Sequence, residues 1–308
     1  MDWVAFFSAA VVAGTPLLFA TLGEIITEKS GNLNLGVEGM MLLGAIAGFI
    51  TGLKTGSAVI ALISAMIAGG FGGLIFSYLT VSLRANQVVT GLALTIFGAG
   101  VSSLLGTTVV GEIVPESIKG IFAQRRIPIL GDIPYIGEIF FRQDAFIYLS
   151  YIIAVILGIY LLKTNKGNKL KAVGENPAAA DVASINVTLY KYAHTILGGA
   201  LCGLGGAYLS LVYVPAWQEN ITAGRGWIAV ALVIFASWNP YKALLGAYLF
   251  GGLDIIGFRI TQALISPYFL SMLPYVVTIM VLVMVSARKS RKNAPPKGLG
   301  IAYFREER

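Results

Sequence analysis

The segment that organises this chain is polar and basic, and it reads KTNKGNKLKAVGENPAAADVASINVTLYK from Lys163 to Lys191, between two long apolar runs. At its centre Asn176 can cap a helix, and Pro177 suits the first helical position because the N–H of that position has no intrahelical partner. Three alanines follow, with high helix propensity and little side-chain bulk. The sequence therefore predicts a short exposed helix whose small surface fits a groove on a soluble partner.

The apolar runs on either side belong to a chain of 308 residues, of which 56% are hydrophobic and only 12% are charged. A soluble protein carries about 25% charged residues. Several runs approach or exceed the roughly 20 residues that cross a bilayer, and they are continuous rather than alternating, which disfavours an outer-membrane barrel. We therefore predict an all-α polytopic membrane protein in which residues 1–308 form a single transmembrane domain.

The pattern predicts about nine transmembrane helices, of which the seventh is short and reads as a broken or tilted span. They cover about residues 3–23, 37–53, 57–82, 87–110, 144–163, 192–214, 226–238, 241–260 and 269–287. No Lys or Arg precedes the first run, so we expect an uncleaved first span rather than a signal peptide.

Basic residues at the ends of the apolar runs predict the orientation of the chain. The segment 163–191 and the tail 288–308 are rich in Lys and Arg, which places both in the cytoplasm. Counting spans back from them puts the N-terminus and the loop 111–143 outside. The net charge of +7 thus reflects membrane orientation, and no basic patch interleaved with aromatic residues points to nucleic acid.

The outer loop 111–143 contains three prolines and several glycines, yet it also keeps many apolar side chains. Loops of this length are usually functional or disordered, and the apolar content disfavours disorder. Two readings stay open. Either Arg125 and Arg126 dock a partner on a folded outer surface, or the loop is a lid that packs on its own helices.

A polar break follows the first apolar run and is rich in glycine, glutamate and asparagine. Glycine permits a helix break, and such a break is tolerated at membrane depth only where it faces protein or a watery cavity. We therefore expect Asn32, Asn34 and Glu38 to line a translocation route. The alternative is an ordinary cytoplasmic turn in which Glu28 and Lys29 are solvated and Asn34 caps the next helix.

A second polar break reads VPAWQENITAGRGW from Val214 to Trp227 and has a similar composition. It supplies Glu219, Asn220 and Trp227 as further candidates for the translocation route. Under the predicted orientation the two breaks lie on opposite sides of the membrane, as an inverted repeat about the central polar segment would place them. Taken singly, Trp217 and Trp227 are better explained as interfacial aromatic residues.

Few other residues are candidates for a role in binding or catalysis. Asp254 lies in an apolar run with Arg259 five residues on, which indicates either a functional charge or an ion pair. His194 is the only histidine, so a histidine-based metal site is not expected, and Cys202 reads as a small buried hydrophobe. The sequence has no Gly-Lys dipeptide and hence no phosphate-binding loop. We expect no metal, no cofactor and no enzymatic activity on this chain, so any ATP that drives transport is hydrolysed by another chain.

Two runs carry a family resemblance: SGNLNLGVEGMMLLGA from Ser30 to Ala45 and GENPAAADVASINV from Gly174 to Val187. They resemble the permease subunits of ABC importers, in the simple-sugar and nucleoside branch related to ribose and branched-chain amino acid permeases. The chain looks most like the shorter permease of nucleoside uptake systems, and the resemblance covers nearly its whole length. One departure is Ser184, where the family pattern usually has glycine.

The resemblance implies a permease subunit that receives a nucleoside from an extracytoplasmic solute-binding protein. It also implies a partner ATPase that holds ATP and magnesium, and a second homologous permease as heterodimer partner, in the cytoplasmic membrane of a prokaryote. The helix that couples to the ATPase would be formed by Gly174, Glu175, Asn176, Pro177, Ala178, Ala179 and Ala180. The same machinery carrying a monosaccharide is an alternative. An ion-coupled secondary transporter is an alternative of another class, and it would need no groove-fitting cytoplasmic helix.

Overall fold

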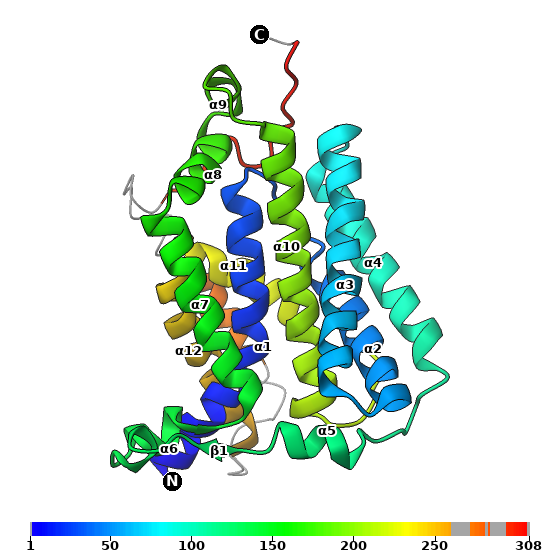
Figure 1. The fold of residues 1–308 in the computed structure, drawn as a ribbon, viewed down its shortest axis with the longest axis vertical. Coiled ribbons are helices and arrows are strands. Elements are labelled where there is room, and N and C mark those ends of the chain that lie inside the picture. The colour runs from blue at the N-terminus through cyan, green and yellow to red at the C-terminus, as the bar shows by residue number, and fades with distance from the viewer. Residues whose placement is uncertain (1, 260–271, 281–282, 284–293, 307–308) are drawn as a thin grey trace.

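The long helices lie side by side, and several of their termini lie at the two ends of the molecule (Figure 1). This computed structural model describes all residues except 1, 260–271, 281–282, 284–293 and 307–308. The helices α8 and α9 lie at one end, here termed the α9 end, and the N-terminal part of α1 lies with α6 at the other, the α6 end. The long helices are α1 (Trp3–Lys29), α2 (Val37–Thr55), α3 (Ala58–Ser77), α4 (Gln87–Gly106), α7 (Ala145–Lys163), α10 (Val187–Tyr208) and α12 (Pro240–Arg259).

Shorter elements connect these helices. Two π-helical turns, η1 (Tyr78–Ser82) and η3 (Leu209–Tyr213), extend α3 and α10. The remaining elements are α5 (Glu116–Ile121), β1 (Arg125–Arg126), η2 (Leu130–Asp132), α6 (Ile136–Phe140), β2 (Arg142–Gln143), α8 (Asn165–Glu175), α9 (Pro177–Val182) and α11 (Arg225–Phe235).

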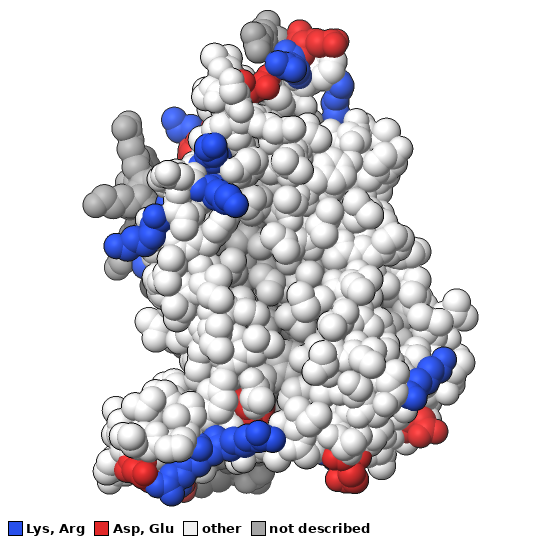
Figure 2. Space-filling view, in the orientation of Figure 1, with Lys and Arg blue, Asp and Glu red and all other residues white. Residues whose placement is uncertain are grey.

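Six helical stretches among the described residues are long and apolar enough to cross a membrane, and they belong to α1, α2, α3 with η1, α4, α7 and α10 with η3. The expected short seventh run is confirmed as α11, an apolar helix of 11 residues. The expected ninth run, 269–287, lies partly outside the described residues, and within it 272–280 is helical. Figure 2 shows charged side chains gathered toward the two ends of one face, with an uncharged band between them. The chain is a multi-pass helical membrane protein.

Two helix boundaries differ from the sequence prediction by five residues or more. The helix α1 continues beyond residue 23 to Lys29, because its buried carboxylates find hydrogen-bond partners inside the protein and so do not end the helix. The helix α10 begins at Val187 rather than 192, where the side chain of Asn186 accepts a hydrogen bond from Leu189 N at 2.9 Å and caps the helix. Hydropathy alone places neither end, since the residues involved are polar.

The centre of the bundle is formed by α1 and α10, which pack against each other. The helix α1 also packs on α12 and α11, and α10 also packs on α2 and α3. Glycines allow this close approach, since a Cβ added at Gly44 of α2 would overlap the backbone of Gly203 in α10. Small residues at helix contacts are typical of membrane bundles, in which close backbone packing replaces the hydrophobic effect.

The loop 111–143 is folded against the α6 end. Its strands β1 and β2 form an antiparallel pair, with Arg125 opposite Gln143 and Arg126 opposite Arg142. The expected all-α class therefore holds apart from this small two-stranded sheet and one isolated bridge. Three apolar side chains of the loop are buried in the main core: Val114, Ile118 and Phe122. The loop is thus anchored on its own helices while the side chains of β1 stay exposed.

Candidate functional site

The first break, residues 30–36, turns back along α1 and is mostly buried. Asn34 donates from its backbone N and from Nδ2 to the two carboxylate oxygens of Glu24, each at 3.1 Å. Its Oδ1 accepts from Gly36 N at 2.9 Å. Glu24 lies five residues before the end of α1 at Lys29, so the break descends about 7 Å along the helix at 1.5 Å per residue. The polar groups of Asn34 are satisfied by protein, which makes an irregular backbone tolerable at this depth.

The alternative of an ordinary solvated turn at this break is wrong. Glu28 is only 2% exposed, and its Oε2 accepts from Trp238 Nε1 at 2.5 Å. The ammonium group of Lys29 lies 5.6 Å from the centroid of the Trp238 ring, within cation–π range. Asn34 does not cap α2, whose first turn has no side-chain cap bond. The side chains at this end of α1 therefore hold the connection after α11 rather than facing water.

Two buried polar atoms beside the first break have no hydrogen-bond partner in the described part of the chain. Asn32 donates from Nδ2 to Thr195 Oγ1 on α10 at 2.9 Å, but its Oδ1 is unpaired. Gln87, at the start of α4, accepts from Leu33 N at 2.6 Å, but its Nε2 is unpaired. Unpaired buried groups are uncommon and each needs an explanation, such as a water or ligand that binds there.

The second break is joined to the first by Glu38. Glu38 lies in the first turn of α2, and its Oε1 accepts from Thr222 Oγ1 at 2.5 Å and from Gly224 N at 2.8 Å. Its Oε2 accepts from Gly226 N at 2.5 Å. The carboxylate therefore occupies the N-terminus of α11, where free N–H groups and the helix dipole favour an anion. The sequence placed the two breaks on opposite sides, yet the structure brings the start of α2 against the start of α11.

A second carboxylate reaches the start of α11 from another direction. Asp254 of α12 forms an ion pair with Arg225 at 2.8 Å, and the guanidinium of Arg225 also lies 5.5 Å from the ring centroid of Tyr213. The structure thus pairs Asp254 of α12 with α11, and the side chain of Arg259, the partner that the sequence suggested, lies outside the described part of the chain. This contact lies next to the Glu38 cap, so the first turn of α11 is held by acidic side chains of two helices.

The other candidates of the second break lie elsewhere. Glu219 is exposed and accepts a hydrogen bond from Ser103 of α4 at the edge of a cavity of about 310 Å³. Asn220 is exposed and adopts a left-handed backbone conformation with φ 53°. Trp227 is 38% exposed, in keeping with an interfacial residue. The same expectation is wrong for Trp217, which is buried and packs on Phe49 of α2.

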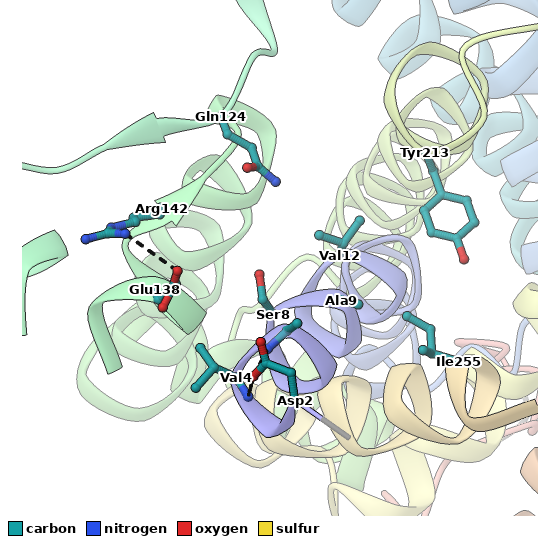
Figure 3. Close-up of a pocket in the computed structure, with 11 residues that line it drawn as sticks. Asp2, Val4, Ser8, Ala9, Val12, Gln124, Glu138, Arg142, Tyr213 and Ile255 are labelled. Carbon is teal, nitrogen blue, oxygen red and sulfur yellow. Dashed lines mark hydrogen bonds and ion pairs between the residues drawn. The ribbon is translucent and has the colours of Figure 1, made fainter. Parts of the chain in front are cut away.

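A cavity of about 590 Å³ opens at the α6 end, a size typical of small-molecule sites (Figure 3). Its walls come from the first turns of α1, from the segment around α6 and β2, from η3 and from α12. The polar lining groups are Asp2, Ser8, Gln124, Glu138, Arg142 and Tyr213. Glu138 and Arg142 form an ion pair at 3.6 Å. Tyr213 lines the cavity and also contacts Arg225, so its ring lies between the cavity and the start of α11.

The central polar segment forms the predicted short helix. Asn176 Oδ1 accepts from Ala179 N at 3.0 Å, and Pro177 occupies the first position of α9. Ala178 and Ala179 are exposed, whereas Ala180 is buried in a small apolar cluster with Val173 and Val187. Just beyond this helix, Ser184 has a left-handed backbone with φ 59°, which is the conformation that glycine adopts most easily.

Two residues without an expected role are satisfied in the core. The Nε2 and Nδ1 atoms of His194 lie 2.7 Å from Tyr160 Oη and from Tyr190 O. Cys202 is a fully buried member of the main apolar cluster. The prediction of a small buried hydrophobe at Cys202 is confirmed. Among the described residues no group of three or more His, Cys, Asp or Glu side chains is placed to hold a metal ion.

The comparison with known families decides the class. Residues 6–284 match the family described as the branched-chain amino acid transport system, permease component. The chain belongs to this family. It is 39% identical, over 97% of each chain, to TsgC13 of Haloferax volcanii, whose name describes a glucose ABC transporter permease protein. It is 32% identical to the guanosine ABC transporter permease protein NupQ of Bacillus subtilis, over 97% of this chain and 96% of NupQ. It is 27% identical to NupP, a guanosine ABC transporter permease protein of the same organism, over 78% of this chain and 70% of NupP.

These comparisons confirm the resemblance seen in the sequence and make this permease a membrane transport subunit rather than an enzyme. The sequence missed the residues that complete the site, namely Thr222, Gln87 and Trp238. In the sequence, the only local sign of these contacts was the set of glycines in the second break, because a free N–H at Gly224 or Gly226 needs an acceptor.

Proposed function

We propose that this permease passes a nucleoside from an extracytoplasmic solute-binding protein to the cytoplasm, driven by a separate ATPase that binds ATP and magnesium. The observation that carries the proposal is α9, a capped helix held outside the spanning helices with Ala178 and Ala179 exposed. Such a small surface suits a groove on a soluble partner. The seven residues Gly174, Glu175, Asn176, Pro177, Ala178, Ala179 and Ala180 would form the coupling element.

The proposed translocation route starts at the 590 Å³ cavity and passes the two breaks. The residues assigned to it are Asn32, Asn34, Glu38, Glu219, Asn220 and Trp227. The unpaired Oδ1 of Asn32 supports this assignment, because a polar solute or water could satisfy it. The bonds of Asn34 to Glu24 and of Glu38 to the start of α11 correspond to a sealed state of the route, and they must loosen for a solute to pass.

Two partners besides the ATPase follow from this function. The organism that carries NupQ also carries NupP, and this chain resembles both, which supports a heterodimer with a second permease. We assign the docking of the solute-binding protein to Arg125 and Arg126 on the outer loop. Arg126 forms an ion pair with Asp132, whereas no described residue forms an ion pair with Arg125. Arg125 is therefore the better candidate for a partner carboxylate.

The topology belongs to the same proposal. We assign about nine spans to a single permease domain over residues 1–308, related by an inverted repeat and placed in the cytoplasmic membrane of a prokaryote. The N-terminus and the loop 111–143 lie outside. The segment 163–191 and the tail 288–308 lie in the cytoplasm, as their basic residues favour. The α9 end is then the cytoplasmic end.

A monosaccharide is the second candidate solute, favoured by the 39% identity to TsgC13. The resemblance to NupQ favours a nucleoside. Both solutes carry a polyhydroxylated sugar ring, so the residues of the breaks suit either. The solute can be decided with the reconstituted transporter and its own binding protein, by measuring whether guanosine or glucose stimulates ATP hydrolysis.

The test of the coupling assignment is Ala179→Glu, with Ala179→Ser as the matched control. A bulky charge on the exposed face of α9 should abolish solute-stimulated ATP hydrolysis, whereas serine should retain it. The folded state of each variant is checked by its elution in mild detergent. Stimulated hydrolysis that survives Ala179→Glu would contradict the assignment. Uptake into liposomes that lack any ATPase, following a proton or sodium gradient, would instead favour an ion-coupled transporter.

A further inference from the structure

Residues 296–306, in the last described segment of the chain, fold back over the α9 end, and we term them the C-terminal clasp. At its centre Gly298 N donates to Gly174 O at 2.9 Å, and Gly300 N donates to Gly31 O at 3.2 Å. Gly174 lies near the end of α8, beside the coupling helix, and Gly31 begins the first break. The clasp therefore joins two segments that are far apart in sequence.

Glycine makes this junction possible. A Cβ on Gly298 would lie 2.8 Å from Gly174 O, and a Cβ on Gly31 would lie 3.3 Å from Gly298 O. A Cβ on Gly174 would overlap the carbonyl oxygen of Lys29 at the end of α1. Three backbone segments thus meet where none carries a side chain, and side chains at these points would separate them.

Side chains extend the same attachment to α9. The hydroxyl of Tyr303 donates to Asp181 Oδ2 at 2.9 Å, and Arg305 Nε lies 3.0 Å from the same oxygen. Asp181 belongs to α9 itself. The Tyr303 ring packs on the apolar cluster that contains Ala180, so one face of the coupling helix is covered by the clasp.

Two further contacts tie the clasp to the rest of the bundle. Leu299 packs on the apolar cluster shared by α1, α7, α8, α11 and α12. The guanidinium of Arg84, in the connection between α3 and α4, lies 3.4 Å from the centroid of the Phe304 ring, which is a close cation–π contact. A polar groove of about 520 Å³ remains between the clasp, the turn after α9 and the end of η1.

We propose that the C-terminal clasp is a transmission element, which fastens the coupling helix α9 to the first break so that movement of α9 reaches Asn32 and Asn34. The proposal rests on the coupling role proposed for α9. Asp181 is the link on the side of the helix, and Gly31 is the link on the side of the break. Without the clasp, α9 would still be reachable by an ATPase, but its motion would be poorly transmitted to the route.

The test uses the full transporter with two substitutions in the clasp, Tyr303→Phe and Arg305→Gln, combined in one variant. Each removes a bond to Asp181 with little change of shape. Losing the Tyr303 hydrogen bond and the Arg305 ion pair should lower the equilibrium constant for the docked clasp about 30-fold. Ile301→Ala is the matched control, because that side chain lies in the same segment and is 60% exposed.

Two measurements distinguish the proposed role of the clasp from the coupling role proposed for α9. A nitroxide label on Val182→Cys, an exposed position of α9, reports the mobility of the helix by electron paramagnetic resonance. The only native cysteine, Cys202, is buried, so the label is selective. We expect a mobile component in the double variant but not in Ile301→Ala, together with loss of solute-stimulated ATP hydrolysis while the ATPase still co-purifies.

An unchanged spectrum in the double variant would refute the proposal that the clasp fastens α9. A mobile α9 with fully retained solute-stimulated hydrolysis would overturn its role in transmission. Failure of the coupling assignment itself is recognised separately, because Ala179→Glu would then leave hydrolysis intact whatever the clasp does. A chain that ends after Pro295 provides a second variant, in which the spectrum must become at least as mobile as in the double variant.

Discussion

The carboxylate of Glu38 gives the sharpest test of how the two breaks are held together. In the substitution Glu38→Gln the amide oxygen can keep one side of the bonding, for example Thr222 Oγ1 and Gly224 N. The amide NH₂ then faces Gly226 N, so two donors confront each other where the carboxylate accepted at 2.5 Å. The negative charge at the start of α11 is lost as well.

The magnitude follows from these contacts. A lost hydrogen bond to a charged group costs about 1.5–3 kcal/mol, and a lost charge at a partly buried helix N-terminus costs up to about 2 kcal/mol. Because the effects overlap, we expect about 2–4 kcal/mol for Glu38→Gln. At roughly 2 °C per kcal/mol for a large chain, the midpoint of thermal unfolding should fall by about 4–8 °C. Glu38→Ala should be worse, because it leaves the N–H groups of Gly224 and Gly226 without their acceptor.

The assay is the unfolding midpoint in detergent, followed by intrinsic fluorescence and by loss of the monodisperse peak. The matched control is Glu219→Gln, since Glu219 is exposed and hydrogen-bonded only to Ser103 in the described part of the chain. This control should shift the midpoint by about 2 °C or less, as expected for a surface substitution. Equal midpoints for Glu38→Gln, Glu219→Gln and the unmodified chain would refute the reasoning.

Two further predictions concern the α9 end. Trp238→Phe leaves the buried Glu28 carboxylate without its indole donor, so the unfolding free energy should fall by about 1–3 kcal/mol; an unchanged thermal midpoint would show that water replaces the indole. Ser184→Gly relieves a left-handed backbone that costs a non-glycine residue about 1–2 kcal/mol, so stability should rise by up to that amount, with Ala183→Gly as the neighbouring control that should show no gain.

The sequence predicted the class of fold because hydropathy, charge placement and helix capping are local properties. Asn176 and Pro177 specified a helix start without any tertiary information, and α9 begins where they predict. The short apolar run 226–238 similarly became α11. The end of α1 was misplaced because Glu24 and Glu28 look like the end of a span until their distant partners are known.

The candidate site depended on pairings that no local pattern carries. Glu38 and Gly226 are separated by 188 positions, and Asp254 could equally have paired within its own helix. Each residue type was informative, since a buried carboxylate requires donors and a glycine-rich helix start offers them. The pairing of these residues could not be predicted, because it depends on how α2 and α11 lie against α1 in three dimensions.

The first break links the attachment of α9 to the start of α11. Gly31 accepts a bond from the C-terminal clasp, and Glu38 caps α11 beside the Arg225–Asp254 pair. The attachment of α9 at Gly31 and the cap of α11 at Glu38 are therefore separated by only the six residues 32–37. Because Asn34 ties this stretch to α1, a shift of the clasp must either carry the break with it or break the bonds to Glu24. In the proposed mechanism, movement of α9 thus acts on the bonds that seal the proposed route, without having to displace α1 as a whole.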